Sequence, residues 1–120
     1  MSRKPVDVVQ ARLRELAGAD TVAFGGVGFV GELLPVTEAY RELAAAVARD
    51  GEALRPQLEW LVEHGSPAGK VYGVTLLREL DPAAAREAWR RLAGDRSEVT
   101  TFSGCVMNKS TLAEYAASQL

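Results

Sequence analysis

The sequence predicts an all-α domain of about six helices. Apolar residues recur at spacings of three and four along most of the chain, and glycine and proline separate these segments. Two similar joints, His64-Gly-Ser-Pro67 and Glu79-Leu-Asp-Pro82, each place a capping residue and a proline at the start of a helix. Such repeated short joints are typical of helical hairpins stacked in the HEAT or armadillo manner. We therefore expect one HEAT-like domain over residues 1–120, with at most a minimal two-stranded extended pair.

The first half of the chain contains three expected helices and one interruption. Pro5 suits a first helical turn, and Gly18 ends the apolar periodicity that follows it. Residues 21–24 are rich in β-formers and predict a short strand. Thr37 is expected to cap the second helix, which Asp50-Gly51 separates from the third. The expected helices here span about 5–17, 37–50 and 52–64.

The second half contains three more helices and a second extended segment. Ser66-Pro67 and Asp81-Pro82 are the expected helix starts, and Ser110 is the expected cap of the last helix. Residues 99–102 read as extended, and a turn follows them. Whether residues 21–24 and 99–102 pair is left open by the sequence. The expected helices here span about 67–80, 82–93 and 110–119.

Composition and charge narrow the functional classes. Of 120 residues, 48% are hydrophobic and 25% are charged, which is typical of a globular domain with its own core. The net charge of −2 argues against nucleic-acid binding, which requires a basic face. No apolar run reaches about 18 residues, so we expect no membrane span, and we expect no signal peptide. A single cysteine cannot form an internal disulfide, and we expect a cytoplasmic protein.

The stretch from Gly65 to Leu80 carries a family resemblance. It reads GSPAGKVYGVTLLREL, and Asp81-Pro82 and Ser103-Gly-Cys105 follow it, with GGVGF at 25–29 before it. These motifs are similar to those of a group of small, uncharacterised bacterial HEAT-like helical proteins. That group shares a Ser/Thr-Pro-Ala-Gly-(Lys/Arg)-x-Tyr helix, a downstream Asp-Pro helix start and a late Ser-Gly-Cys turn. The resemblance covers about 22–117 and implies a HEAT-like fold, with no activity and no cofactor attached to it.

The glycine-rich segment spells G-x-G-x-x-G from Gly26 to Gly31. In a dinucleotide site this pattern joins a strand to a helix whose N-terminus meets a pyrophosphate. Leu34-Pro35 stands where that helix should run, so we expect a bend instead, with a small backbone anion nest as the alternative. The candidate binding residues of this segment are Phe24, Gly26, Gly28 and Phe29.

Cys105 and His64 are the candidate catalytic residues. A nucleophilic cysteine needs a helix N-terminus, a cation or a histidine to lower its pKa, and His64 is the sole imidazole. A buried structural cysteine and a histidine at a helix C-terminus are the alternatives. Glu59 and Glu63 lie four residues apart, but no E-x-x-H pattern accompanies them, so we expect no metal site.

Two tryptophans are the candidate partner-binding residues. Trp60 and Trp89 both lie at helical spacing with leucines, so each belongs either to the core or to an exposed interface. Our first hypothesis is a non-catalytic module that docks a protein partner through Trp60, Trp89 or the glycine-rich segment. The alternatives are a small cofactor-free enzyme or redox-responsive protein using Cys105, and an immunity or inhibitor protein. A homodimer is also compatible with the sequence.

Overall fold

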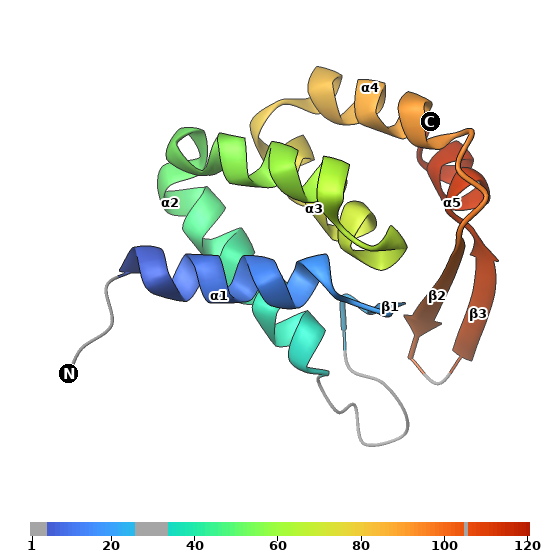
Figure 1. Cartoon of the computed structure of the whole chain (residues 1–120), viewed down its shortest axis with the longest axis horizontal. Helices are drawn as coiled ribbons and strands as arrows, with labels where there is room; N and C mark the ends of the chain where they lie inside the picture. The colour runs from blue at the N-terminus through green and yellow to red at the C-terminus, as the bar shows by residue number, and fades with distance from the viewer. Residues whose placement is uncertain (1–4, 26–33, 105) are drawn as a thin grey trace.

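The protein is mainly α-helical. The computed structural model describes residues 5–25, 34–104 and 106–120, and these residues form five helices and a small three-stranded sheet (Figure 1). In chain order the elements are α1 (Pro5–Ala17), β1 (Thr21–Val22), α2 (Pro35–His64), α3 (Pro67–Leu80), α4 (Pro82–Leu92), β2 (Glu98–Ser103), β3 (Val106–Thr111) and α5 (Leu112–Gln119).

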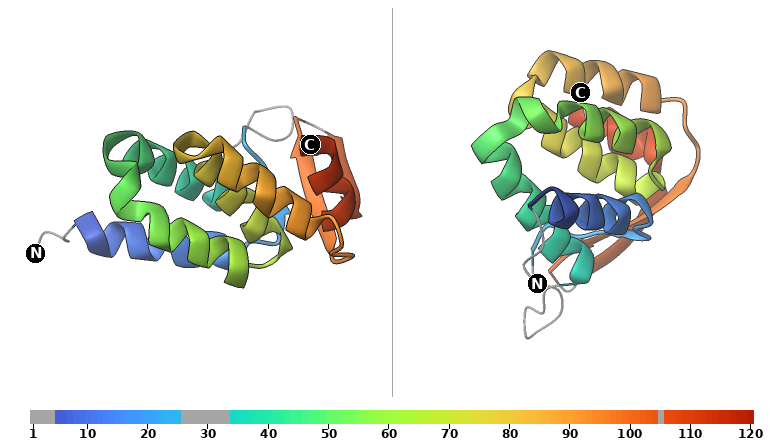
Figure 2. Two further views of the ribbon diagram at one scale, coloured as in Figure 1. Left: turned by 90° about the horizontal axis from the view of Figure 1, so that it is seen from above. Right: turned by 60° about the vertical axis from the view of Figure 1, so that its left-hand side comes forward.

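Helices that follow one another in the chain pack against one another. α1 packs on α2, α2 on α3, α3 on α4 and α4 on α5. The sheet and α5 lie together at one end of the helices, on the side away from the free end of α1 (Figure 2). The molecule measures 42 × 36 × 20 Å, so its thinnest dimension corresponds to about two helices. Within the described residues no helix combines the length and apolarity that crossing a membrane requires.

Helix α2 replaces two of the expected helices. The predicted break at Asp50-Gly51 is a kink inside one helical run, because Asp50 has non-helical angles of φ −154° and ψ 60°. The side chain of Leu80, the last residue of α3, lies where a Cβ atom at Gly51 would be, so α3 approaches the kink closely. In place of the six expected helices, the described residues therefore form five, with α2 divided into two halves.

The start of α2 differs from the prediction. Thr37 does not cap the helix, which begins at Pro35 after Leu34 with no side-chain cap. Thr37 is instead fully buried, and its hydroxyl donates to the Ala23 carbonyl oxygen at 2.6 Å. The long-range partner takes the hydroxyl because burial requires a hydrogen bond for it.

The two repeated joints form as predicted. The Ser66 hydroxyl accepts from the Gly69 N–H at 3.1 Å, and the Asp81 carboxylate accepts from the Ala84 N–H at 3.0 Å. A proline follows each cap at the first helical position. At α5 the predicted cap is wrong by one residue: Thr111, not Ser110, caps the helix and forms a capping box with Glu114.

The extended segments pair, and a third strand joins them. β1 lies parallel to β2, with Thr21 opposite Thr100, and β3 lies antiparallel to β2. The expected two-stranded limit is therefore wrong. The sequence predicts no strand at β3: its turn lies just before this strand and its last helix begins at about residue 110, because the polar residues of β3 lack the alternation of a half-buried strand. The hairpin turn includes Gly104, whose φ of +60° favours glycine.

The core lies between the helices and extends under one face of the sheet. Tyr72 of α3 is its largest fully buried side chain. Gly69 marks a close contact between α3 and α1, because a Cβ atom there would overlap the backbone oxygen of Leu16. The other large apolar side chains that are less than 2% exposed come from α1, α2, α3, α5 and β2: Leu16, Leu43, Leu58, Leu61, Leu76, Leu112, Val71, Val74 and Val99.

Candidate functional site

The two tryptophans have opposite environments. Trp89 on α4 is only 4% exposed, and its ring packs against Tyr115 of α5 with the ring centroids 5.7 Å apart. Trp60 on α2 is 46% exposed. An exposed tryptophan is uncommon, because its large apolar surface gains free energy on burial. Of the two candidate partner-binding residues, only Trp60 therefore has a side chain that a partner can contact.

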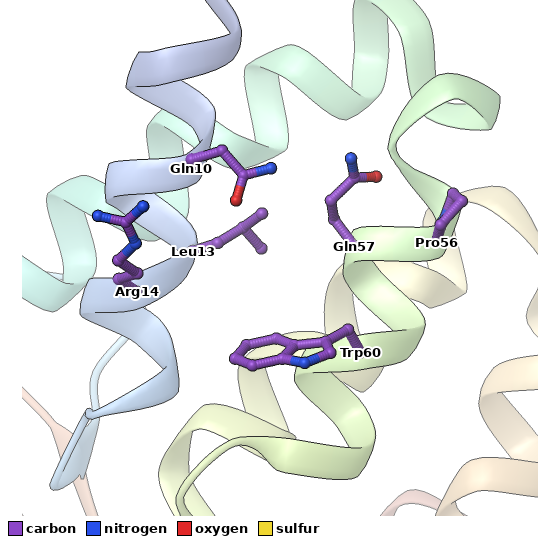
Figure 3. Close-up of a pocket in the computed structure, with 6 residues that line it drawn as sticks. All are labelled: Gln10, Leu13, Arg14, Pro56, Gln57 and Trp60. Atoms are coloured by element: carbon purple, nitrogen blue, oxygen red, sulfur yellow. The ribbon is translucent and has the colours of Figure 1, made fainter.

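Trp60 forms one wall of a groove between α1 and the second half of α2. The groove encloses about 370 Å³. Figure 3 shows Leu13 pointing from α1 toward α2, while the indole of Trp60 reaches back toward α1. Leu13 is 3% exposed and belongs to the core, so the groove floor is rigidly supported. The six lining residues are Gln10, Leu13, Arg14, Pro56, Gln57 and Trp60.

Two carboxamides face this groove. Gln10 comes from α1 and Gln57 from α2, and both lie above the Trp60 ring in Figure 3. Within the described part of the chain, Gln57 Oε1 is the one buried side-chain oxygen or nitrogen without a hydrogen-bond partner. An unpaired buried acceptor costs about 1–3 kcal/mol, so such an atom calls for a specific explanation.

Arg14 supplies the charge of the groove. Its neighbours are neutralised: the Arg12 guanidinium pairs with Glu15 and Glu42, and the Arg55 guanidinium contacts Asp81 Oδ2 at 2.7 Å. Arg14 is exposed and forms no ion pair with any residue that the structure describes. The groove therefore has an apolar centre, two amides and one cation.

His64 lies next to Trp60 at the end of α2. Its imidazole stacks on the indole with the centroids 5.2 Å apart and an interplanar angle of 18°. Its Nδ1 lies 3.2 Å from the Trp60 carbonyl oxygen one turn earlier. Cys105, the proposed nucleophile, lies outside the described residues. The contacts of His64 thus hold the Trp60 side chain in place from the side opposite the kink.

The glycine-rich candidate site is described only at its edge. Phe24 is partly buried and lies in an aromatic cluster, with its ring centroid 5.0 Å from Tyr40 and 5.3 Å from Tyr72. Gly26, Gly28 and Phe29 lie outside the described residues. The aromatic contacts make Phe24 part of the packing between β1, α2 and α3.

Other surfaces of the described residues lack the combination of an exposed aromatic side chain and a groove. Val106 and Met107 on β3 are more than half exposed, but neither lines the Trp60 groove. A second depression beside α1, lined by Val9, Arg12 and Glu42 among others, carries an ion pair across it and no aromatic side chain. No group of three or more His, Cys, Asp or Glu side chains is placed to hold a metal ion in residues 5–25, 34–104 and 106–120.

Sequence reasoning finds Trp60 but misses its companions in the groove. Leu13 belongs to the core, and the edge of this side chain also forms the groove floor. The available signal is the position of Trp60, which flanks the leucine stripe of residues 52–64 rather than belonging to it. Gln10, Arg14 and Gln57 carry no signal, because only tertiary packing brings α1 beside the end of α2.

Comparisons of the chain with protein-family models, with curated proteins and with solved structures yield no match.

Proposed function

We propose that this chain is a HEAT-like, non-catalytic docking module that binds a segment of another protein in the groove between α1 and α2. The observation that carries the proposal is the 46% exposure of Trp60 over a floor formed by the buried Leu13. Binding hot spots are enriched in tryptophan, and they lie in pockets that exclude water once occupied. The pairwise packing of successive helices supports the HEAT-like part of the proposal.

The occupant is a polypeptide segment that inserts one large apolar side chain between Trp60 and Leu13. The groove lies between two helices, the arrangement in which proteins receive an apolar anchor of a partner. Its floor belongs to the core and its wall is stacked on His64, so little side-chain entropy is lost on binding. We further propose a cytoplasmic setting, in keeping with the single cysteine.

A displayed library of random twelve-residue peptides tests the proposal, because it offers the groove a wide range of apolar anchors and flanking charges. The library is selected in parallel on the wild-type protein, on Trp60→Ala and on Met107→Ala. Met107 is the matched control, because it is 55% exposed on β3 and does not line the Trp60 groove. We expect peptides that bind the wild type and Met107→Ala but not Trp60→Ala. No enrichment on the wild type, or equal enrichment on Trp60→Ala, contradicts the docking proposal.

The fluorescence of Trp60 provides a direct measurement of binding by the selected peptides. In a Trp89→Phe background all indole emission comes from Trp60, and we expect a blue shift as a peptide covers the ring. Sedimentation of the free protein tests the other occupant. A concentration-dependent dimer that Trp60→Ala abolishes assigns the groove to a second copy of this chain, and overturns the proposed partner.

A further inference from the structure

Resting on the proposed docking function, we infer that the segment bound in the groove is acidic: it places a carboxylate within a few residues of its apolar anchor, on the α1 side. The six residues that line the groove include one cation, Arg14, and no anion. Arg14 lines the same groove as Leu13, so a carboxylate a few residues from the anchor meets its guanidinium at the α1 edge. Complementary charge at the edge of an interface selects partners and accelerates their association.

Two other arginines near the groove form ion pairs within the protein, whereas Arg14 is available to a carboxylate of the bound segment. Arg12, two residues earlier, turns to the opposite flank of α1 and contacts Glu42 of α2. Arg55, near the other wall, is held by Asp81 and by Glu59 at 3.3 Å. Among the residues described by the structure, Arg14 alone of these three lacks a carboxylate.

The guanidinium of Arg14 lies at the edge of the groove. Figure 3 shows Arg14 on α1 with its guanidinium outside the space between Leu13 and Trp60. The anchor therefore enters an apolar centre, while the carboxylate stays in partial contact with water. This is the usual anatomy of a protein interface, with an apolar core and a polar rim. A rim ion pair contributes mainly selectivity, and its loss weakens binding about two- to five-fold.

The two carboxamides explain why the occupant is a peptide rather than an isolated carboxylic acid. Gln10 and Gln57 have no side-chain hydrogen-bond partner within the described residues, and Gln57 Oε1 is buried without one. A carboxamide both donates and accepts, so it pairs with a backbone amide group in two directions. A segment crossing the groove brings such groups past both side chains.

Charge reversal provides the test. The peptide library is selected on the wild type, on Arg14→Glu and on Arg86→Glu. Arg86 is the matched control, because it is exposed on α4, away from the groove, and its reversal changes the net charge equally. We expect Asp or Glu near the apolar anchor on the wild type and on Arg86→Glu, and Lys or Arg at that place on Arg14→Glu. Arg14→Gln should weaken the acidic peptides about two- to five-fold.

The result separates this inference from the proposed function. Peptides that require Trp60 but carry no acidic residue overturn the acidic preference and leave docking intact. A library with no Trp60-dependent peptide overturns both. In the supporting case, replacing the peptide carboxylate by its amide lowers affinity for the wild type and not for Arg14→Gln, and added salt weakens only the acidic form.

Discussion

The phenol of Tyr72 forms two hydrogen bonds with the backbone of Ala23. Its oxygen accepts from the Ala23 N–H at 2.8 Å and its hydroxyl donates to the Ala23 carbonyl at 3.0 Å, although 49 residues separate the two. Thr37 donates to the same carbonyl. Because the N–H of Ala23 has this phenol as its buried partner, the end of β1 is fastened to α3, and the start of α2 joins them through Thr37.

Tyr72→Phe should therefore destabilise the protein by about 1–3 kcal/mol, since it leaves the buried Ala23 N–H unpaired. Urea unfolding followed by circular dichroism measures this. Tyr115→Phe is the control, because Tyr115 is partly buried but its hydroxyl makes no hydrogen bond among the described residues, and it should change stability by less than about 0.5 kcal/mol. Equal losses of stability in the two variants would contradict a stabilising role for the hydrogen bonds between Tyr72 and Ala23. Burial also raises the pKa of Tyr72, so this phenol should resist ionisation in alkaline titration.

The two tryptophans should differ sharply in their contribution to stability. Trp89→Ala removes a ring that is 4% exposed and should cost about 3–5 kcal/mol. Trp60→Ala removes a half-exposed ring and should cost about 1 kcal/mol. Acrylamide quenching of the single-tryptophan variants Trp60→Phe and Trp89→Phe gives the independent check. Strong quenching of Trp89, or a Trp60→Ala variant that does not fold, would be inconsistent with the structure.

Asp81 should make stability depend on acid pH. The hydrogen bond from the Arg55 side chain, followed by the bond from the Ala84 N–H, lowers the pKa of its carboxyl group. Because the folded-state pKa is below the unfolded value of about 3.9, the stabilisation is present above that pH and is lost as the pH falls through the folded pKa.

Asp81→Asn isolates the charge, because asparagine still caps α4. We expect the variant to be less stable than the wild type at neutral pH, and the difference in unfolding free energy to shrink as the pH is lowered from about 5 toward about 2. A difference that stays constant across this range would show that the carboxylate charge is not the stabilising feature. Asp81→Ala, which also removes the cap, should be the less stable of the two variants at neutral pH.

Removing the carboxamide of Gln57 should weaken peptide binding without lowering the stability of the free protein. Gln57→Met keeps the length of the side chain and removes the unpaired buried oxygen, so the free energy of unfolding should stay the same or rise by up to about 1 kcal/mol. The same variant should bind the selected peptides less tightly. Gln10→Met serves as the comparison, since no atom of Gln10 is both buried and unpaired. A clear loss of stability in Gln57→Met would show that the carboxamide has a structural role.

Local signals along the chain suffice to predict several elements of this fold. α1, α3 and α4 lie within one residue of their predicted bounds, because proline, serine and aspartate act within one helical turn. The predicted break at Asp50 coincides with the kink in α2, where non-helical angles at Asp50 precede glycine, a poor helix former.

Features that depend on distant partners become visible only once the chain is folded. Thr37 is equally suited to a cap and to burial, and the Ala23 carbonyl decides between them. β3 has little apolar alternation and becomes a strand because β2 supplies its hydrogen bonds. Trp60 and Trp89 have similar local patterns, and one is exposed because nothing among the described residues covers that side of α2, whereas α5 covers Trp89. Whether a side chain is exposed depends on which other elements pack against it, and the arrangement of those elements is set by the tertiary structure rather than by the local sequence.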